Sequence, residues 1–471
     1  MAYQRLQVSP GGPQNWARSV RQHAVNPTAA AGNVFASYNR CPFSRITFER
    51  GFLPSPDPLH RLNLCNHDSI AAEWEAALGD IPKLAVAAGG VRPGGSDIAA
   101  CGTSTTATSR GVLRRTLEAL PPFPVGKLLS DAATTLASPT GGLATAAAEH
   151  DSTTLEELWR AYLLLSFLAH AYMWCEPGPP PSILPAVLAV PWVRIAAAID
   201  MPPILTYASY NLCNWRRLDA AGPVRLGNIV CLQNFLGGTD EEWFRLVHVD
   251  IEARAGQAVA GLEAMQRAAA EGDSDAVVAG LISIAEALRD MQATLARMGE
   301  KCDPYIYYQR VRTPMSGWRN NPDLPQGLVY EGVSTEPMQL YGETGAQSSV
   351  VHAFDAGLGI QHDQVWLRDY LDTMVLHMPP AHRAFLRRLA TANSGPTNVR
   401  SYVQRVATAE LRDAYNAAVE ELERFRSQHR AFAHSYIAKW ARKETTGTGG
   451  SDFMPALTGY KDTTSRHVLP Q

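Results

Sequence analysis

A single histidine interrupts an apolar stripe near the C-terminal end of the chain. Between residues 411 and 436 the inward positions follow steps of four and three, as on one face of an amphipathic helix. These positions are Leu411, Tyr415, Ala418, Leu422, Phe425, His429, Phe432 and Tyr436. A protonated imidazole is unstable in apolar surroundings, so His429 should be neutral and should need a partner. A haem iron accepts one neutral imidazole as its proximal ligand, whereas most histidines on an apolar face bond a backbone carbonyl.

Four further segments set the context of this histidine. They are GTGGSDFM at residues 447–454, SGW at 316–318, GLVYEG at 327–332 and MPPAHR at 378–383. Together they resemble the indoleamine 2,3-dioxygenase family, haem enzymes that open the indole ring of tryptophan. The similarity is continuous from about Leu163 to Thr464. It implies an all-α protein that holds haem b in its C-terminal part.

The resemblance assigns roles on the haem side of the site. His429 matches the proximal ligand of the iron, and Arg426, one turn earlier, matches an arginine beside a haem propionate. Asp355 matches the acidic partner of that arginine, and such a pair would anchor the propionate and stiffen the ligand helix. Without the family resemblance, Arg426 would be interpreted as a solvated surface charge.

On the substrate side, the resemblance implies that Arg312 grips the amino-acid carboxylate through two parallel hydrogen bonds. Arg310 is two residues away, but the spacing back from the SGW segment favours Arg312. Tyr307 stands where the family usually has phenylalanine. The other matched pocket positions are Tyr207 and Phe244 beside the indole, Thr344 and Gly345 near bound oxygen, and Thr448 at the substrate ammonium and haem edge.

Besides Tyr307, three residues depart from the family pattern. His248 replaces a common serine, and the related tryptophan 2,3-dioxygenases have a histidine there that accepts a hydrogen bond from the indole N–H. His248 would then bond the substrate; as an alternative it would ligate the iron and block oxygen. Tyr210 and Asn211 replace smaller, less polar residues, which predicts a tighter or reshaped inner pocket. The glycine loop at 447–450 lacks the lysine of a phosphate-binding loop, so it suits a lid rather than a nucleotide site.

Helical periodicity dominates the chain, and alternating strand patterns are scarce. We expect helices over 69–87, 151–174, 348–358, 365–377, 380–391, 399–407 and 408–443, with another that opens at Pro202-Pro203 and carries Leu205, Tyr207, Leu212 and Trp215. Segments 240–272 and 273–299 should form an antiparallel helical pair, and 300–345 should be irregular. The expected organisation is an irregular segment 1–50, a small helical domain 51–235 and a large haem-binding domain 236–471. Residues 88–139 resemble an insertion that loops out.

The composition excludes several classes of protein. The net charge of −3 and the lack of a basic stripe argue against nucleic-acid binding. Seven scattered cysteines without close pairs argue against a disulfide framework and a zinc site, and fit a reducing compartment. No segment is apolar for long enough to span a membrane. We expect a cytosolic monomer, although five arginines and no acidic residue in the first 48 residues are a bias shared with mitochondrial transit sequences.

The expected activity is insertion of both atoms of O₂ across the C2–C3 bond of L-tryptophan to give N-formylkynurenine, with an external electron donor that reduces the iron. Three alternatives remain open at this stage. The first is a haem oxygen carrier, which would not need Arg312 and Thr448. The second is a family relative that oxidises another indole in a biosynthetic route. An all-helical interaction protein without a cofactor would leave His429 and the glycine loop unexplained.

Overall fold

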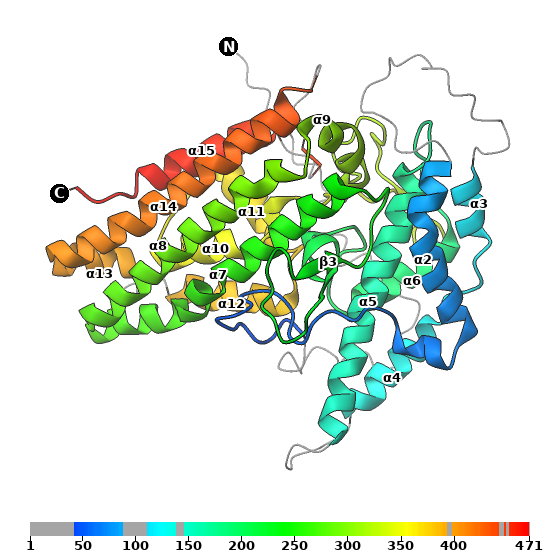
Figure 1. The fold of residues 1–471 in the computed structure, drawn as a ribbon, viewed down its shortest axis with the longest axis horizontal. Coiled ribbons are helices and arrows are strands. Elements are labelled where there is room, and N and C mark those ends of the chain that lie inside the picture. The colour runs from blue at the N-terminus through cyan, green and yellow to red at the C-terminus, as the bar shows by residue number, and fades with distance from the viewer. Residues whose placement is uncertain are drawn as a thin grey trace.

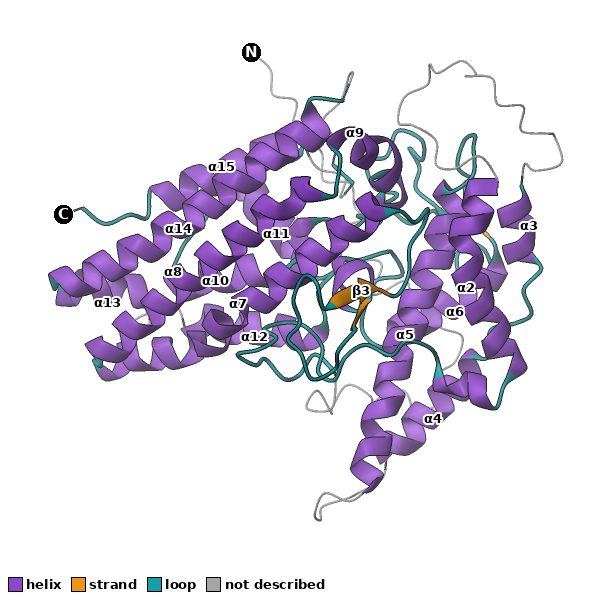
Figure 2. Cartoon of the chain, in the orientation of Figure 1, coloured by secondary structure: helices purple, strands orange, loops and turns teal. Residues whose placement is uncertain are grey.

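The computed structural model of the chain describes residues 42–87, 111–137, 146–392, 398–441, 447–448 and 452–470, without the side chains of 133–137 and 146–154. Residues 1–41 of the expected irregular segment, and 88–110, 138 and 139 of the expected insertion, lie outside the described residues. The predicted all-α class is confirmed. Strands in the described residues form only two short pairs among the helices (Figure 2).

Helices packed side by side form the larger part of the molecule (Figure 1). They are α7 (Thr239–Glu271), α8 (Ser274–Ala296), α14 (Ala409–Ala433) and α15 (Phe453–Ser465). Helix α7 contacts α8, α8 contacts α14, and α14 contacts α15. Gly272 ends α7 in a left-handed conformation (φ 80°), and the Asp273 side chain accepts a hydrogen bond from the Ala276 N–H to start α8. This two-residue turn confirms the predicted antiparallel pair.

Helix α14 carries the stripe that contains His429. The Thr408 hydroxyl caps its first turn by accepting from the Leu411 N–H. Leu411, Tyr415, Ala418, Leu422 and Phe425 are all buried, as the stripe predicts. The predicted helix 408–443 is too long, because α14 ends at Ala433 and passes into one turn of π-helix, η10 (His434–Ala438). A π turn widens the helix locally and often lies at a functional site.

The helices that pack around this group agree with their predicted ranges to within two residues. They are α10 (Ser349–Leu358), α11 (Val365–Val375), α12 (Pro380–Ala392) and α13 (Val399–Val406). Residues 300–345 contain only single turns and short pairings, as expected. These and neighbouring short elements are η5 (Arg297–Glu300), α9 (Pro304–Ile306), η6 (Tyr307–Val311), η7 (Thr313–Met315), η8 (Gly345–Gln347) and β4 (Val329–Tyr330), which pairs in parallel with β1 (Ile183–Leu184).

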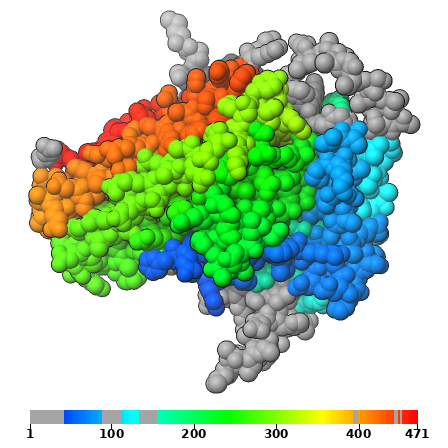
Figure 3. Space-filling model, in the orientation of Figure 1, coloured from blue at the N-terminus to red at the C-terminus, as the bar shows by residue number. Residues whose placement is uncertain are grey.

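The other end of the molecule is a second group of helices. It contains η3 (Asn63–Asn66), α2 (Ser69–Ala87), α3 (Val112–Glu118), α4 (Val125–Ala137), α5 (Ala146–Trp174) and α6 (Ala186–Ala198). Residues 158–174 of α5 are buried on every side, so this helix is the core of the group. In Figure 3, α2 (blue) and the start of α14 (orange) lie at opposite ends of the molecule. The predicted division into two domains stays a prediction.

Two predictions were wrong in this region. Residues 111–137 do not loop out, because α3 and α4 bury Leu113, Leu117 and Leu128 against the group around α5. The segment after Pro202-Pro203 is not a long helix. It holds one turn of π-helix, η4 (Ala208–Leu212), after which Trp215 belongs to β2 (Trp215–Arg217), antiparallel to β3 (Ile229–Cys231). Helix α6 was not predicted, because Pro185 and Pro191 interrupt its pattern.

Residues 42–57, which we call the N-terminal strap, cross α7 and α12. Gly51 has a φ of 56° and lies so close to α7 that a Cβ on Gly256 would be 2.6 Å from the Gly51 nitrogen. The His382 ring on α12 lies between Phe43 (ring centroids 5.0 Å apart) and Phe52 (4.6 Å). The strap is therefore part of the packed core, although it has no regular structure.

Candidate functional site

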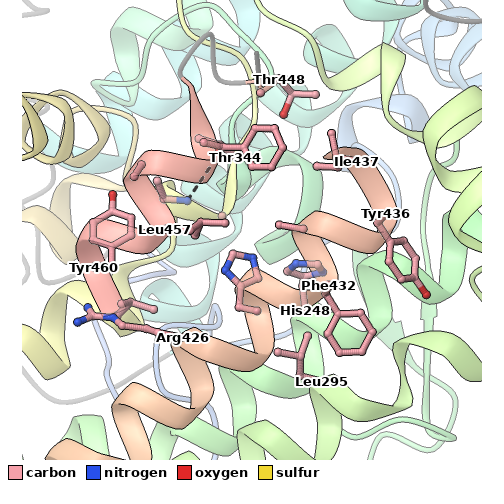
Figure 4. A pocket seen from close by; sticks show the side chains of 18 of the residues that line it. His248, Leu295, Thr344, Arg426, Phe432, Tyr436, Ile437, Thr448, Leu457 and Tyr460 are labelled. Atoms are coloured by element: carbon pink, nitrogen blue, oxygen red, sulfur yellow. Dashed lines mark hydrogen bonds between the residues drawn. The ribbon is translucent and has the colours of Figure 1, made fainter. Parts of the chain in front are cut away.

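A large cavity opens between α7, α8, α10, α14, α15 and the loops around Thr344 and Thr448. The space within it is about 1450 Å³, including the part that opens to solvent. Figure 4 shows Thr344 and Thr448 on one side of the cavity, Leu295 opposite them, and Arg426 with Tyr460 at one end. Aromatic and aliphatic side chains form most of its wall.

His429 faces this cavity from α14, between Phe425 and Phe432. Burial, with a smaller effect of nearby His248, lowers the pKa of His429 to about 4, so the imidazole is neutral at pH 7. His429 makes no hydrogen bond to any residue that the structure describes. Other buried or half-buried histidines do have such bonds, namely His170, His248, His352, His362, His377, His382 and His467. The nitrogen lone pair of His429 is therefore available to a ligand.

Arg426 lies one turn before His429, at the end of the cavity marked by Tyr460 (Figure 4). One guanidinium nitrogen lies 2.8 and 2.7 Å from the two oxygens of Asp355, and another bonds the Thr464 hydroxyl. Burial alone would raise the pKa of Asp355, but Arg426 and a 3.0 Å bond from His362 outweigh it and hold this pKa below its usual range. The expected contact between Arg426 and Asp355 is present, and both residues line the cavity. The Nε of Arg426 is buried without a hydrogen-bond partner among the described residues.

These features fit a haem group. The cavity is broad and mostly apolar, one neutral imidazole faces it without a bond to the described protein, and a held guanidinium lies at its edge. Haem iron needs one proximal ligand, and haem propionates are anions that an arginine can bond.

An aromatic wall faces the cavity from α7 and η6. The ring of Phe244 lies 4.5 Å from that of His248 and 4.7 Å from that of Tyr307. His248 Nδ1 is 2.7 Å from the carbonyl oxygen of Phe244. A carbonyl only accepts, so Nδ1 carries the proton and the Nε2 lone pair remains free. Burial lowers the pKa of His248 and keeps the ring neutral.

Two predicted pocket residues, Tyr207 and Arg312, are not among the residues that line the cavity. Tyr207 is buried behind the wall, with its ring 6.1 Å from His248 and its N–H bonded to the Gln347 side chain. Arg312 is half-buried, and burial lowers the pKa of its guanidinium while Tyr307 beside it acts in the opposite direction. Arg310 is exposed. The assignment of the substrate carboxylate to Arg312 rather than Arg310 stays a prediction.

Three loops meet at the side of the cavity where Thr344 and Thr448 lie. The Thr448 hydroxyl donates to the carbonyl oxygen of Glu343 at 2.7 Å, and its own carbonyl accepts from the Gly317 N–H at 3.2 Å. A Cβ on Gly317 would lie 2.1 Å from the Gly342 nitrogen, so no side chain fits there. Gly345 and Thr344 also line the cavity. Thr448 is thus held between the SGW turn and the loop of residues 342–345.

Glu343 is a pocket residue that the sequence did not single out. Its side chain lines the cavity and is only 4% exposed, and burial raises the pKa of its carboxyl to about 8. The Asn211 amide donates to one carboxyl oxygen at 3.1 Å. A lone glutamate between a glycine and a threonine looks like an exposed loop charge, and nothing in the local pattern indicated its burial.

Comparisons with known proteins agree with this site. The family model of indoleamine 2,3-dioxygenase matches residues 143–467. Human indoleamine 2,3-dioxygenase 2 is 34% identical over 326 residues, which cover 66% of this chain and 79% of that protein. Indoleamine 2,3-dioxygenase acdA of Aspergillus candidus is 34% identical over 67% of this chain and 82% of its own length. A myoglobin of Haliotis madaka is 30% identical over 65% and 80% respectively.

The match covers α5 to α15, and so includes the site residues considered above. It confirms the resemblance found in the sequence. The chain therefore belongs to the indoleamine 2,3-dioxygenase family of oxidoreductases.

Proposed function

We propose that this protein is a haem-dependent dioxygenase that opens the indole ring of L-tryptophan between C2 and C3 with O₂ and releases N-formylkynurenine. The observation that carries the proposal is the neutral imidazole of His429, which faces a large apolar cavity without a hydrogen bond to the described protein. Family membership supports the same reaction class.

In this proposal His429 holds the iron of haem b through its free nitrogen, and Arg426 bonds a propionate while Asp355 fixes the guanidinium. When bound, the haem supplies an iron that takes up and activates O₂ after reduction by an external electron donor. The side chains of this chain need not supply a strong base, because the indole ring is itself electron-rich. Their proposed work is to orient the substrate and to exclude water.

Phe244 and Tyr307 offer flat apolar surface to an indole, and His248 Nε2 would accept a hydrogen bond from the indole N–H. Arg312 is the proposed partner of the substrate carboxylate, since its guanidinium lies near Tyr307, a residue that lines the cavity. Thr448, which bonds Gly317 and Glu343, would contact the ammonium group. Thr344 and Gly345 would line the part of the cavity that O₂ enters.

The test is direct. Full-length protein is loaded with haem b, reduced with ascorbate and a mediator, and given L-tryptophan in air, and the absorbance of N-formylkynurenine is followed. We expect product at a rate proportional to bound haem. His429→Ala is the negative control, and exposed His434→Ala is its matched positive control. A haem-loaded protein that binds L-tryptophan but never consumes O₂ would refute the proposal.

Two other functions have specific support. The relative named myoglobin favours an oxygen-binding protein on this scaffold, which would bind O₂ reversibly and ignore tryptophan. A different indole substrate in a biosynthetic route is favoured by four residues that differ from the family pattern, namely His248, Tyr210, Asn211 and Tyr307.

The kynurenine pathway, the cytosol and a monomeric state stay predictions. None of the described helices is both long and apolar enough to cross a membrane.

A further inference from the structure

The carboxyl group of Glu343 is an unusual feature of the cavity wall. It is one of two acidic side chains that line the cavity in the described chain; the other, Asp355, is bonded to both Arg426 and His362. Glu343 has no such ion pair. Its Oε1 accepts from the Asn211 amide, and its Oε2 has no hydrogen-bond partner among the described residues. A buried carboxyl with an unused oxygen on a cavity wall is costly unless a ligand completes its bonding.

The residues behind Glu343 are also polar and incompletely bonded. Asn211 and Tyr210 are 0% exposed, and the Asn211 Oδ1 and the Tyr210 hydroxyl have no hydrogen-bond partner in the described chain. Arg245, fully buried, lies over the Tyr210 ring with its guanidinium carbon 4.7 Å from the centroid. If the substrate ring were purely apolar, apolar side chains at these positions would bind it without the free-energy cost of buried polar atoms that lack hydrogen bonds.

The side chain and the backbone of Glu343 have different partners. Its carboxyl bonds the fully buried Asn211, whereas Thr448 contacts Glu343 through the backbone carbonyl. With the substrate ammonium at Thr448, as proposed above, a ring that extends into the cavity can reach the Glu343 carboxyl.

We infer that Glu343, oriented by Asn211, is a specificity-determining residue that binds a hydroxyl group on the benzo ring of an indole substrate. This inference rests on the proposed function and narrows its substrate class to hydroxylated tryptophans. A hydroxyl group both donates and accepts, so it matches a carboxyl in either protonation state. Burial holds the pKa of Glu343 near 8, so the protonated form, which can itself donate, dominates at neutral pH. Asn211 is a positioning residue, because it acts through Glu343.

The experiment compares substrates on the haem-loaded full chain. L-tryptophan and its 4-, 5-, 6- and 7-hydroxy derivatives are assayed for kcat/KM, and their dissociation constants are measured by equilibrium dialysis without reductant. The variants are Glu343→Ala, Glu343→Gln and Asn211→Leu. Glu336→Ala, which changes an exposed glutamate of the same region, is the matched control.

We expect at least one hydroxytryptophan to be favoured over L-tryptophan by about tenfold or more in the parent protein, in both binding and kcat/KM. The ratio should fall toward one in Glu343→Ala, fall partly in Asn211→Leu and in the isosteric Glu343→Gln, and stay unchanged in Glu336→Ala. A parent ratio near one overturns the inference whatever the variants do, and so does an equal ratio in parent and Glu343→Ala. The corresponding aminotryptophans are assayed in parallel, and a stronger preference for them overturns the choice of a hydroxyl.

These results separate the two proposals. Turnover of L-tryptophan without any effect of ring hydroxylation leaves the proposed function standing and removes the inference alone. A parent protein that neither binds nor oxidises any of these indoles removes both.

Discussion

His248 Nδ1 lies 2.7 Å from the carbonyl oxygen of Phe244, one turn earlier on α7. This bond fixes both the ring orientation and the tautomer, and leaves a lone pair on Nε2. The side chain can therefore accept from a substrate N–H, and it can equally ligate iron. The two possibilities are open to experiment because they predict different spectra.

The first prediction concerns His248→Ser. If Nε2 accepts from the indole N–H, the loss of one neutral hydrogen bond should cost about 0.5–1.5 kcal/mol in kcat/KM and leave haem content unchanged. The same change should improve the relative use of 1-methyl-tryptophan, which has no N–H and needs room for a methyl group. A low-spin, six-coordinate ferrous spectrum in the parent that becomes five-coordinate in the variant would instead identify His248 as an iron ligand.

The second prediction concerns His429→Ala. Removal of the only proposed proximal ligand should abolish stable haem retention while circular dichroism still shows a mostly helical protein, because the rest of the α14 stripe remains buried. His434→Ala changes an exposed histidine five residues later and should bind haem normally. A normal Soret band and ligand-binding spectrum in His429→Ala would show that another residue holds the iron.

The third prediction separates two neighbouring arginines. Arg312→Leu should raise the KM for tryptophan sharply with unchanged haem content, since a charge-assisted contact of this kind is worth about 2–5 kcal/mol in transition-state binding. Arg310→Leu should have much less effect, because Arg310 is exposed and Arg312 is half-buried beside Tyr307. Steady-state kinetics on both variants decides the matter, and equal effects would contradict the assignment.

The fourth prediction concerns Asp355→Asn. Arg426 would lose its charged partner in a mostly buried place, so the free energy of unfolding at pH 7 should fall by about 3 kcal/mol, and haem should dissociate faster. Because the folded pKa of Asp355 lies below its ordinary value of 3.8, its contribution is complete above that pH and is lost as the pH falls further. Urea unfolding of both proteins should therefore show a difference that shrinks below about pH 4. A difference that grew on acidification would contradict the ion pair.

The sequence predicted the elements whose signals are local. The α14 stripe, the α7–α8 turn at Gly272 and the helices from α10 to α13 all depend on a period of 3.6 residues and on nearby capping residues. It failed at α3 and α4, where the composition of 88–139 suggested a loop although Leu113 and Leu117 are spaced for a helix face. It also failed after Pro202, because the strand pairing of Trp215 with Cys231 is a contact between distant segments.

Some residues of the candidate site could be predicted from the sequence and others could not. His429 and its stripe could be found from spacing, and Arg426, Asp355 and Phe244 from family resemblance. The burial of Glu343 could not, because it depends on Asn211 from a separate π turn and on the Thr448 loop. The position of Tyr207 could not be predicted either, because its backbone N–H bonds the side chain of Gln347, 140 positions away in sequence.

The N-terminal strap has a consequence for any shortened version of this protein. The recognisable family region begins at residue 143, yet Gly51 lies against Gly256 on the helix that carries His248, and Phe43 and Phe52 enclose His382. A fragment cut at the homology boundary would lose these contacts and expose the back of α7 and α12 to water. The part of the chain needed for folding is thus longer than the part that matches the family model. Truncations for expression should therefore keep residue 42 onward.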